Sequence, residues 1–310
     1  GTFYVFNGFF MEMREKYVKP GAEIHYFVAE WDPVGLSWAD FRGTLLGPTD
    51  PTTAPPNSIR GTIFRDWQAM GLRKEPDIAD NGVHASASPV EALFERMNWL
   101  GVSVEQDPFG AQLLQAGIGA ELIDTWSKDP QVKHGHGRTT TPFYDFMEDK
   151  DSDVCLEKCT IVAKVGHTPA IVRNTALIFI KPHAITEKTK DLVREHLEAK
   201  GVSILSEGRI EAETIDRDML IDKHYYAIAS KATLVTPDQL PVPKDKFREK
   251  FGLDWETALN SGRVLNARDA CTQMNLDAAG LGAAWVQAQQ DGNLIKFGGG
   301  FYCARIDIVT

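Results

Sequence analysis

Apolar positions in the first hundred residues follow the periods of helices and strands in turn. The stretch "EIHYFVAEW" (23–31) is nearly continuous in apolar character, which predicts a buried strand. Further on, "SPVEALFERMNWL" (88–100) predicts a helix with Ser88 as its N-cap and Pro89 at its first position. Near the start, "NGFFMEMREKYV" (7–18) carries apolar residues at helical spacing.

The second half of the chain continues this alternation. The run "TALIFIKPH" (175–183) predicts a buried strand, and "KTKDLVREHLEAKG" (188–201) predicts an amphipathic helix that ends at Gly201. Residues 234–297 show the pattern of short helices with Pro-rich joints. Strands that alternate with helices indicate an α/β or α+β layer fold.

Two strand-like segments lie at opposite ends of the chain. "TFYVF" (2–6) opens it, and "FYCARID" (301–307) stands near its close. We predict that residues 300–307 pair antiparallel with residues 2–6, as the arms of a hairpin whose connection is cut.

Two polar stretches interrupt the periodic segments. The stretch "GPTDPTTAPPNSIRG" (47–61) is too rich in proline for regular structure and predicts a functional loop. Residues 128–153 are polar, contain "KHGHGR" and "MEDKDSD", and are the best linker candidate.

Composition narrows the class of protein. The chain has 310 residues, of which 43% are hydrophobic and 25% charged, as in an ordinary globular protein. The net charge of -10 argues against nonspecific binding to nucleic acid or to an anionic membrane. No apolar run is long enough to span a membrane, and no basic region marks a signal peptide at the start. Four scattered cysteines favour a reducing compartment such as the cytoplasm.

Candidate chemistry begins at "NGVHASAS" (81–88), where a histidine stands among small and hydroxyl residues. Glu95 follows His84 by eleven residues, and the same separation joins Thr49 to Arg60 at the end of the Pro-rich loop. Three further segments are "LIFIKPH" (177–183), "DKHYY" (222–226) and "NGFF" (7–10). Together these motifs resemble the nucleoside diphosphate kinase family, and they cover about half of the chain.

The resemblance implies phosphoryl transfer from a nucleoside triphosphate to a nucleoside diphosphate through a phosphohistidine. His84 would be the nucleophile and Glu95 the residue that orients it, since a neutral imidazole with a fixed tautomer is a competent nucleophile near pH 7. Mg²⁺ would come with the nucleotide. The other implied roles are neutralisation of phosphate charge by Lys181 and Arg60, hydrogen bonds from Ser86 and Tyr225, phosphate binding by Thr49 and Arg42, a bond from Asn81 to the sugar hydroxyl, and stacking of the base on Phe9.

The order of the motifs departs from the family. Joining the end of the chain to its start restores the family order, so the resemblance implies a circularly permuted, ferredoxin-like α+β fold with an antiparallel sheet and a helical insertion. A fragment cut across two tandem repeats is the alternative. One complete fold needs both halves, from one chain or from two exchanging chains, so a homo-oligomer or exchanged dimer is a further expectation. The expected parts are a histidine-bearing half (1–100), a helical extension and linker (101–174), a Lys-Pro half (175–228), a helical insertion (229–298) and a closing strand (299–310).

A second function stays open. Ala87 and Gly43 stand where the family has an aspartate and a phosphate-binding arginine, which favours an inactive nucleotide-binding or scaffold protein. A protein metal site is not expected, because neither His134 with His136 nor Cys155 with Cys159 completes a zinc ligand set.

Overall fold

The computed structural model describes residues 1–134, 139–166, 173–298 and 300–307. It divides the chain into two compact units, and the boundaries differ from those expected from the sequence. Unit 2 is the continuous stretch Gly21–Glu211, whereas unit 1 combines Gly1–Pro20 with Ala212–Thr310. The first twenty residues therefore belong with the end of the chain, not with the rest of the predicted histidine-bearing half.

Unit 2 contains a four-stranded antiparallel sheet in the order β3-β6-β2-β7. Its described strands are β2 (Glu23–Trp31), β3 (Val83–Ala85), β4 (Gln131–His134), β5 (Thr139–Pro142), β6 (Asn174–Ile180) and β7 (Ser203–Glu211). Its described helices and helical turns are α2 (Trp38–Asp40), η1 (Phe41–Leu46), η2 (Pro51–Thr53), α3 (Ile59–Asp66), α4 (Pro89–Leu100), α5 (Pro108–Gln115), α6 (Ala120–Trp126), α7 (Phe143–Met147), α8 (Ser152–Ala163), η3 (Pro182–Ala184) and α9 (Glu187–Ala199).

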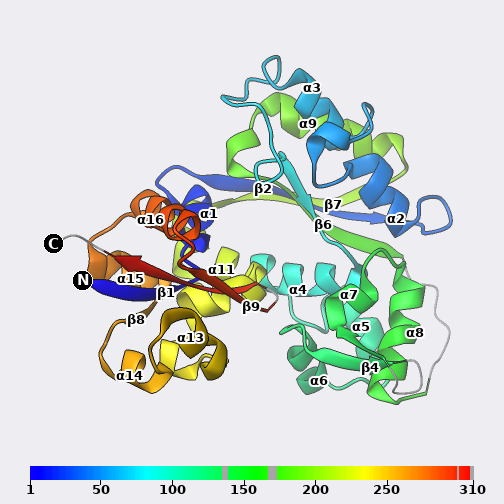
Figure 1. Ribbon diagram of the computed structural model, residues 1–310. Coiled ribbons are helices and arrows are strands. Elements are labelled where there is room, and N and C mark those ends of the chain that lie inside the picture. The colour runs from blue at the N-terminus through cyan, green and yellow to red at the C-terminus, as the bar shows by residue number, and fades with distance from the viewer. Residues whose placement is uncertain (135–138, 167–172, 299, 308–310) are drawn as a thin grey trace. The chain divides into compact units, whose positions relative to one another are not determined.

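Both faces of this sheet are covered, which explains the continuous apolar run of β6. All seven residues of β6 are buried, as the sequence predicted. Figure 1 shows α3 and α9 on one side of the sheet and α4 on the other. Alternate residues of β6, such as Ile178 and Ile180, pack into the core that contains α3 and α9. Leu177 and Phe179 alternate with them and therefore point to the side of α4.

A second core in unit 2 occupies the segment that was expected to be a linker. Residues 131–134 and 139–142 pair as a hairpin, and α7 and α8 follow. Apolar residues of α4 to α8 bury one another there, among them Trp126, Phe143 and Met147. The described part of residues 128–153 is thus folded into unit 2. Its few apolar residues are buried in this core, although the composition of the segment is mostly polar.

Unit 1 contains a separate four-stranded sheet in the order β8-β1-β10-β9. Its described strands are β1 (Thr2–Phe6), β8 (Val264–Asn266), β9 (Leu294–Gly298) and β10 (Phe301–Asp307). Its described helices and helical turns are α1 (Phe10–Val18), α10 (Ala212–Arg217), α11 (Leu220–His224), α12 (Tyr226–Ala229), η4 (Ser230–Leu234), η5 (Pro237–Gln239), α13 (Lys244–Phe251), α14 (Trp255–Asn260), α15 (Ala267–Met274) and α16 (Ala278–Gln290).

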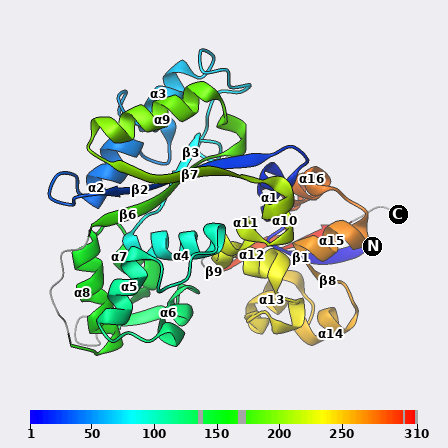
Figure 2. The ribbon, with the colours of Figure 1, turned by 180° about the vertical axis from the view of Figure 1, so that it is seen from behind.

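The central pair of the unit 1 sheet is β1 with β10, and it confirms the predicted pairing of the chain's two ends. The strands are antiparallel, with Thr2 opposite Asp307 and Phe6 opposite Cys303. Figure 2 shows the N-terminal strand β1 among the C-terminal elements of this unit. Helices α15 and α16 cover one face of the sheet, and α13 and α14 cover the other. The segment 229–298 is mainly helical, as predicted, but β8 and β9 also place it within the sheet.

The protein is therefore an α+β protein whose sheets are formed mostly of antiparallel strands, compatible with a ferredoxin-like class. None of the described helices has the length and apolar character needed to cross a membrane.

Candidate active site

His84 lies at the centre of β3, on an edge of the unit 2 sheet. It pairs with Phe179 of β6, and the two rings stack with centroids 4.7 Å apart. Its neighbours Val83 and Ala85 face the core beneath α3 and α9. The alternation of a strand therefore turns His84 toward α4, and 18% of its side chain stays exposed to solvent.

Glu95 of α4 binds both His84 and Ser86. Its Oε1 lies 2.7 Å from Nε2 of His84, and its Oε2 accepts a hydrogen bond from the Ser86 hydroxyl at 2.5 Å. The Ser86 oxygen in turn accepts from the backbone N–H of Leu177 at 3.0 Å. Because Glu95 and Ser86 are buried, these bonds hold the carboxylate in one orientation.

This arrangement assigns a tautomer to His84. A carboxylate only accepts hydrogen bonds, so the His84 nitrogen that faces Glu95 carries the proton. In the neutral ring, the proton on Nε2 leaves the lone pair on Nδ1. The Glu95 carboxylate can also stabilise positive charge on the ring.

Local sequence signals bring these three residues together. Gly82 has a φ of 90°, a conformation that favours glycine, and the chain turns there into β3. Ser88 caps α4 by accepting from the N–H of Glu91, and Pro89 occupies the first helical position. The helix begins as predicted, only a few residues after His84, and its buried face carries Glu95.

The two residues that were predicted to neutralise phosphate charge, Arg60 and Lys181, lie near the start of β3. Arg60 donates to the carbonyls of Val83 and Gly47, with distances from 2.8 to 3.1 Å. Lys181 follows β6 and donates from Nζ to the carbonyl of Ala79 at 2.9 Å. Both side chains are largely buried and thus join the Pro-rich loop and the Lys-Pro segment to the histidine strand.

Asn81 connects the same strand to Thr49. Its Nδ2 donates to the Thr49 carbonyl at 2.9 Å, while the Thr49 residue itself is exposed. Asn81 is 1% exposed, and its Oδ1 has no hydrogen-bond partner among the described residues. A buried carbonyl oxygen of this kind is a ready acceptor for a hydroxyl group.

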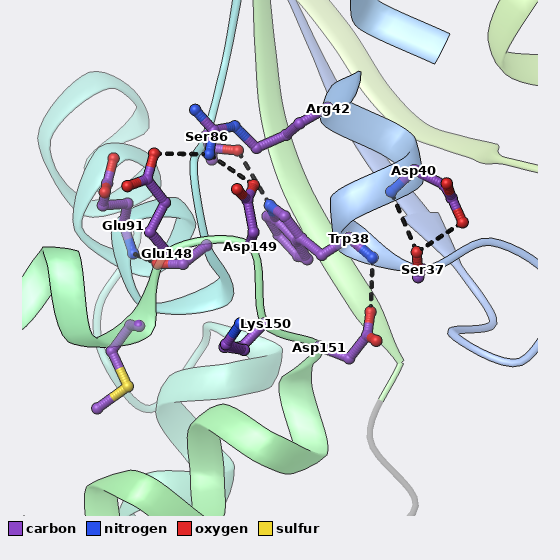
Figure 3. Close-up of polar contacts among 12 residues, drawn as sticks. Ser37, Trp38, Asp40, Arg42, Ser86, Glu91, Glu148, Asp149, Lys150 and Asp151 are labelled. Atoms are coloured by element: carbon purple, nitrogen blue, oxygen red, sulfur yellow. Dashed lines mark hydrogen bonds and ion pairs between the residues drawn. The ribbon is translucent and has the colours of Figure 1, made fainter. Parts of the chain in front are cut away.

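Arg42 of η1 contacts carboxylates of unit 2. Its Nη1 lies 2.8 Å from Oε1 of Glu148 and 2.6 Å from Oδ1 of Asp149. Figure 3 shows these residues together. Burial works to lower the pKa of Arg42, but its bonds to Glu148 and Asp149 outweigh burial and raise that pKa. The structure thus places the predicted phosphate ligand Arg42 in an ion-pair cluster.

Glu91, one turn before Glu95 on α4, belongs to the same acidic neighbourhood (Figure 3). Burial, aided by the negative charges of Glu95 and Glu148, raises the pKa of Glu91 to about 8, against the opposite effect of Arg42. Glu91 is therefore mostly neutral at pH 7.

Phe9 and Tyr225 belong to unit 1. Phe9 makes edge contacts with Trp285 and Tyr302, both with centroids 5.7 Å away. Tyr225 ends α11 and packs against the apolar core of that unit. Their predicted roles in base stacking and hydrogen bonding beside His84 stay predictions.

The residues considered for zinc have other contacts. His134 pairs with the Thr141 hydroxyl at 2.8 Å, and His136 lies outside the described residues. Cys155 and Cys159 are fully buried, and burial raises the pKa of both thiols. Within unit 2 alone, the described part of the chain contains no group of three potential metal ligands.

Several residues that shape the site gave little signal in the sequence. Trp38 donates from its indole N–H to the Ser86 carbonyl at 3.2 Å, and Phe179 forms the floor under the His84 ring. Glu148 and Asp149 belonged to an acidic run that is typical of a solvated linker. The pattern of "LSWADFRGTLLG" (36–47) is typical of a short helix that Ser37 caps, and the structure confirms this cap.

Compared with models of protein families, with curated proteins and with solved structures, the chain gives no match.

Proposed function

We propose that this chain transfers phosphoryl groups between nucleotides in the manner of a nucleoside diphosphate kinase, with His84 as the residue that is phosphorylated. The observation that carries the proposal is the contact of Glu95 with both His84 and Ser86. A histidine that only packs needs no buried carboxylate on its ring nitrogen. Here the carboxylate fixes the tautomer and leaves the nucleophilic lone pair on Nδ1.

Two half-reactions follow from this arrangement. In the first, Nδ1 of His84 forms a bond to the γ-phosphorus while the bond to the β–γ bridging oxygen breaks. The nucleoside diphosphate leaves with that oxygen and its electron pair, and the Nε2 proton stays on the ring beside Glu95. A second nucleoside diphosphate then takes the phosphoryl group by the reverse steps, so no oxidant or water is consumed.

Mg²⁺ is part of the proposed substrate, as the Mg²⁺–nucleotide complex. The carboxylate of Glu95, which contacts His84, does not fit as a direct Mg²⁺ ligand, because His84 and Ser86 engage its two oxygens. Phosphate oxygens suit the ion better. Arg60 and Lys181 supply positive charge beside β3, and the buried Oδ1 of Asn81 supports a bond to a sugar hydroxyl.

The topology of unit 2 supports a permuted, ferredoxin-like domain. Counted from β6, the chain runs β6, α9, β7 and then, after unit 1, β2, α3 and β3. In that count the strand order is four, one, three, two, all antiparallel. Unit 1 would then be the insertion between the Lys-Pro half and the histidine-bearing half, which is larger than the segment 229–298 expected from the sequence.

The alternative function is a nucleotide-binding or scaffold protein without turnover. The observation that favours it is the engagement of Arg42 by two carboxylates, together with Ala87 and Gly43 at positions where the family has polar side chains.

Labelling distinguishes the two functions. The protein is incubated with Mg²⁺ and γ-labelled ATP, and we expect an acid-labile, base-stable phosphate on His84. The His84→Ala variant should take no label and keep its fold, while His196→Ala, a matched change on α9, should label normally. A folded wild-type protein that takes no label, yet binds ATP, would establish the alternative.

A further inference from the structure

Arg42 is held by two acidic residues from a segment outside the proposed nucleotide-binding motifs. Glu148 and Asp149 follow α7, about a hundred residues further along the chain, and both contact the same guanidinium nitrogen (Figure 3). The Arg42 side chain is 26% exposed, and those of Glu148 and Asp149 are 47% and 44% exposed. The guanidinium is thus mostly covered, while its two partners stay in contact with water.

Backbone contacts fix the acidic residues in this place. The N–H of Asp149 donates to the carbonyl of Ala87, within the histidine motif, at 3.0 Å. Two residues later, Asp151 accepts from the backbone N–H of Trp38 at 2.7 Å and from the amide of Asn174, also at 2.7 Å. The segment is therefore tied to the loop that follows β3, to the start of α2 and to the first residue of β6.

Asp149 also adopts a left-handed backbone conformation, with a φ of 58°. Aspartate tolerates this conformation better than most residues, but it still costs free energy relative to an extended or helical one. The chain accepts that cost at the residue whose carboxylate reaches Arg42.

Carboxylates and phosphates compete for the same donors. A guanidinium binds the oxygens of either group through charge-assisted hydrogen bonds of similar length. An ion pair at a partly exposed site contributes little, because water screens it and the side chains lose freedom. Glu148 and Asp149 thus occupy Arg42 in the absence of a ligand, yet a polyanion can displace them.

We propose that Glu148 and Asp149 form an autoinhibitory acidic latch that occupies Arg42 and competes with the polyphosphate of a nucleotide for it. The latch rests on the proposed function, because it needs a nucleotide whose phosphates reach Arg42. The latch gives a function to part of the segment 101–174, which contains none of the family motifs. Opening it requires only that two half-exposed side chains turn into water.

ADP with Mg²⁺ is the probe, and calorimetry measures its dissociation constant. The double variant E148Q/D149N keeps the shape of both side chains and removes their charge. We expect it to bind ADP roughly threefold to tenfold more tightly than the wild type, as the release of two partly exposed ion pairs allows. The matched control D145N/E157Q removes two exposed charges from the same segment and should change the affinity less than twofold.

Arg42 itself completes the test. R42A should weaken ADP binding little in the wild type, where the latch already occupies the guanidinium, but it should abolish the gain in E148Q/D149N. If the pair only anchors the segment, E148Q/D149N lowers the melting temperature without improving affinity, and the latch is overturned. An equal gain in the control also overturns it, since that outcome assigns the effect to long-range charge.

These results separate the latch from the function on which it rests. ADP binding that is equal in the wild type and in E148Q/D149N rejects the latch alone and leaves the nucleotide site standing. No ADP binding by any folded protein rejects the proposed function, and the latch falls with it. Should the double variant not fold, the single variants E148Q and D149N each remove one of the two contacts and are judged by the same criterion.

Discussion

Glu91 is the residue at which burial and charge have the clearest consequence for stability. Its pKa of about 8 in the folded protein lies far above its ordinary value of 4.5. The folded state therefore holds this proton more tightly than the unfolded chain does. Between pH 4.5 and about 8 the unfolded chain loses the proton first, so the free energy of unfolding falls as pH rises, by at most about 1.4 kcal/mol per pH unit.

We predict that Glu91→Gln, which is neutral at every pH, removes this decline. Urea unfolding at pH 5, 6.5 and 8 should show the variant gaining stability relative to the wild type as the pH increases. Glu157→Gln, an exposed change on α8, should keep the wild-type slope. Parallel pH profiles for wild type and Glu91→Gln would contradict a raised pKa at this site.

Single residues also mark the limit of what the sequence can predict. The family resemblance implied the contact between His84 and Glu95, and a strand, a capped turn and a helix bring the two together locally. It did not imply the bond from Ser86 to Glu95, since Ser86 was expected to bond the histidine or the transferred group. The partners of Arg42 were not predictable in this way. Glu148 and Asp149 reach it across 106 and 107 positions, and no local period encodes such a contact.

At the scale of elements, Asp107 joins two helices of unit 2. Its Oδ1 caps α5 by accepting from the N–H groups of Phe109 and Gly110, and its Oδ2 binds Arg96 of α4 at 2.6 Å. Both members of the ion pair are buried, with Asp107 0% and Arg96 2% exposed. Arg96 also donates to the carbonyl of Thr175 in β6 at 2.6 Å, so the pair links α4, α5 and the sheet.

We predict that Asp107→Ala lowers the free energy of unfolding by about 3–5 kcal/mol, because it leaves a buried guanidinium uncompensated and removes a helix cap. Thr186→Ala is the matched control, since Thr186 caps α9 without a buried ion pair. It should cost only about 1 kcal/mol. Urea unfolding followed by circular dichroism measures both, and equal losses would show that the ion pair adds nothing to the cap.

Elements with strong local signals were predicted well, and those without them were not. The strands β2 and β6 and the helices α4 and α9 follow apolar runs or capped periodic patterns. By contrast, the pattern of "DRDMLIDKHYYAIAS" (216–230) is typical of one helix, whereas the structure has the two short helices α11 and α12 there. Met219 adopts a left-handed conformation just before α11, which ends the preceding helical turn without any glycine or proline to signal it.

At the scale of the whole molecule, the sequence predicted an α+β protein but not its division into two units. The expected parts ended at residues 100, 174, 228 and 298, whereas the two compact units divide after Pro20 and after Glu211. The reason is that β1 leaves the histidine-bearing segment and pairs with β10, so the first residues are needed to complete the other sheet. Pairing of the chain's ends was predictable from their apolar pattern; the consequence for the units was not.

Joining the two ends of the chain requires only a short loop. Because Thr2 lies opposite Asp307, a peptide bond from residue 310 to residue 1 leaves only residues 308–310 and Gly1 as a loop between paired strands. Hairpin loops of about four residues are common, so closure should cost little strain. If the chain is then opened between residues 172 and 173, β6 comes first and the Lys-Pro half precedes the histidine-bearing half.

We predict that this joined and reopened chain keeps its far-ultraviolet circular dichroism and melts within about 2 °C of the wild type, a change of about 1 kcal/mol. The strands can form the same pairs in the original and in the rearranged chain, because one connection is added between residues 310 and 1 and one is cut between residues 172 and 173. A joined chain opened between Leu177 and Ile178 is the control, because it cuts the central, fully buried strand β6 and should not fold. If the chain opened at 172 also fails to fold, the original order is required and unit 2 is not a permuted domain, which leaves the cut tandem array as the better explanation of the motif order.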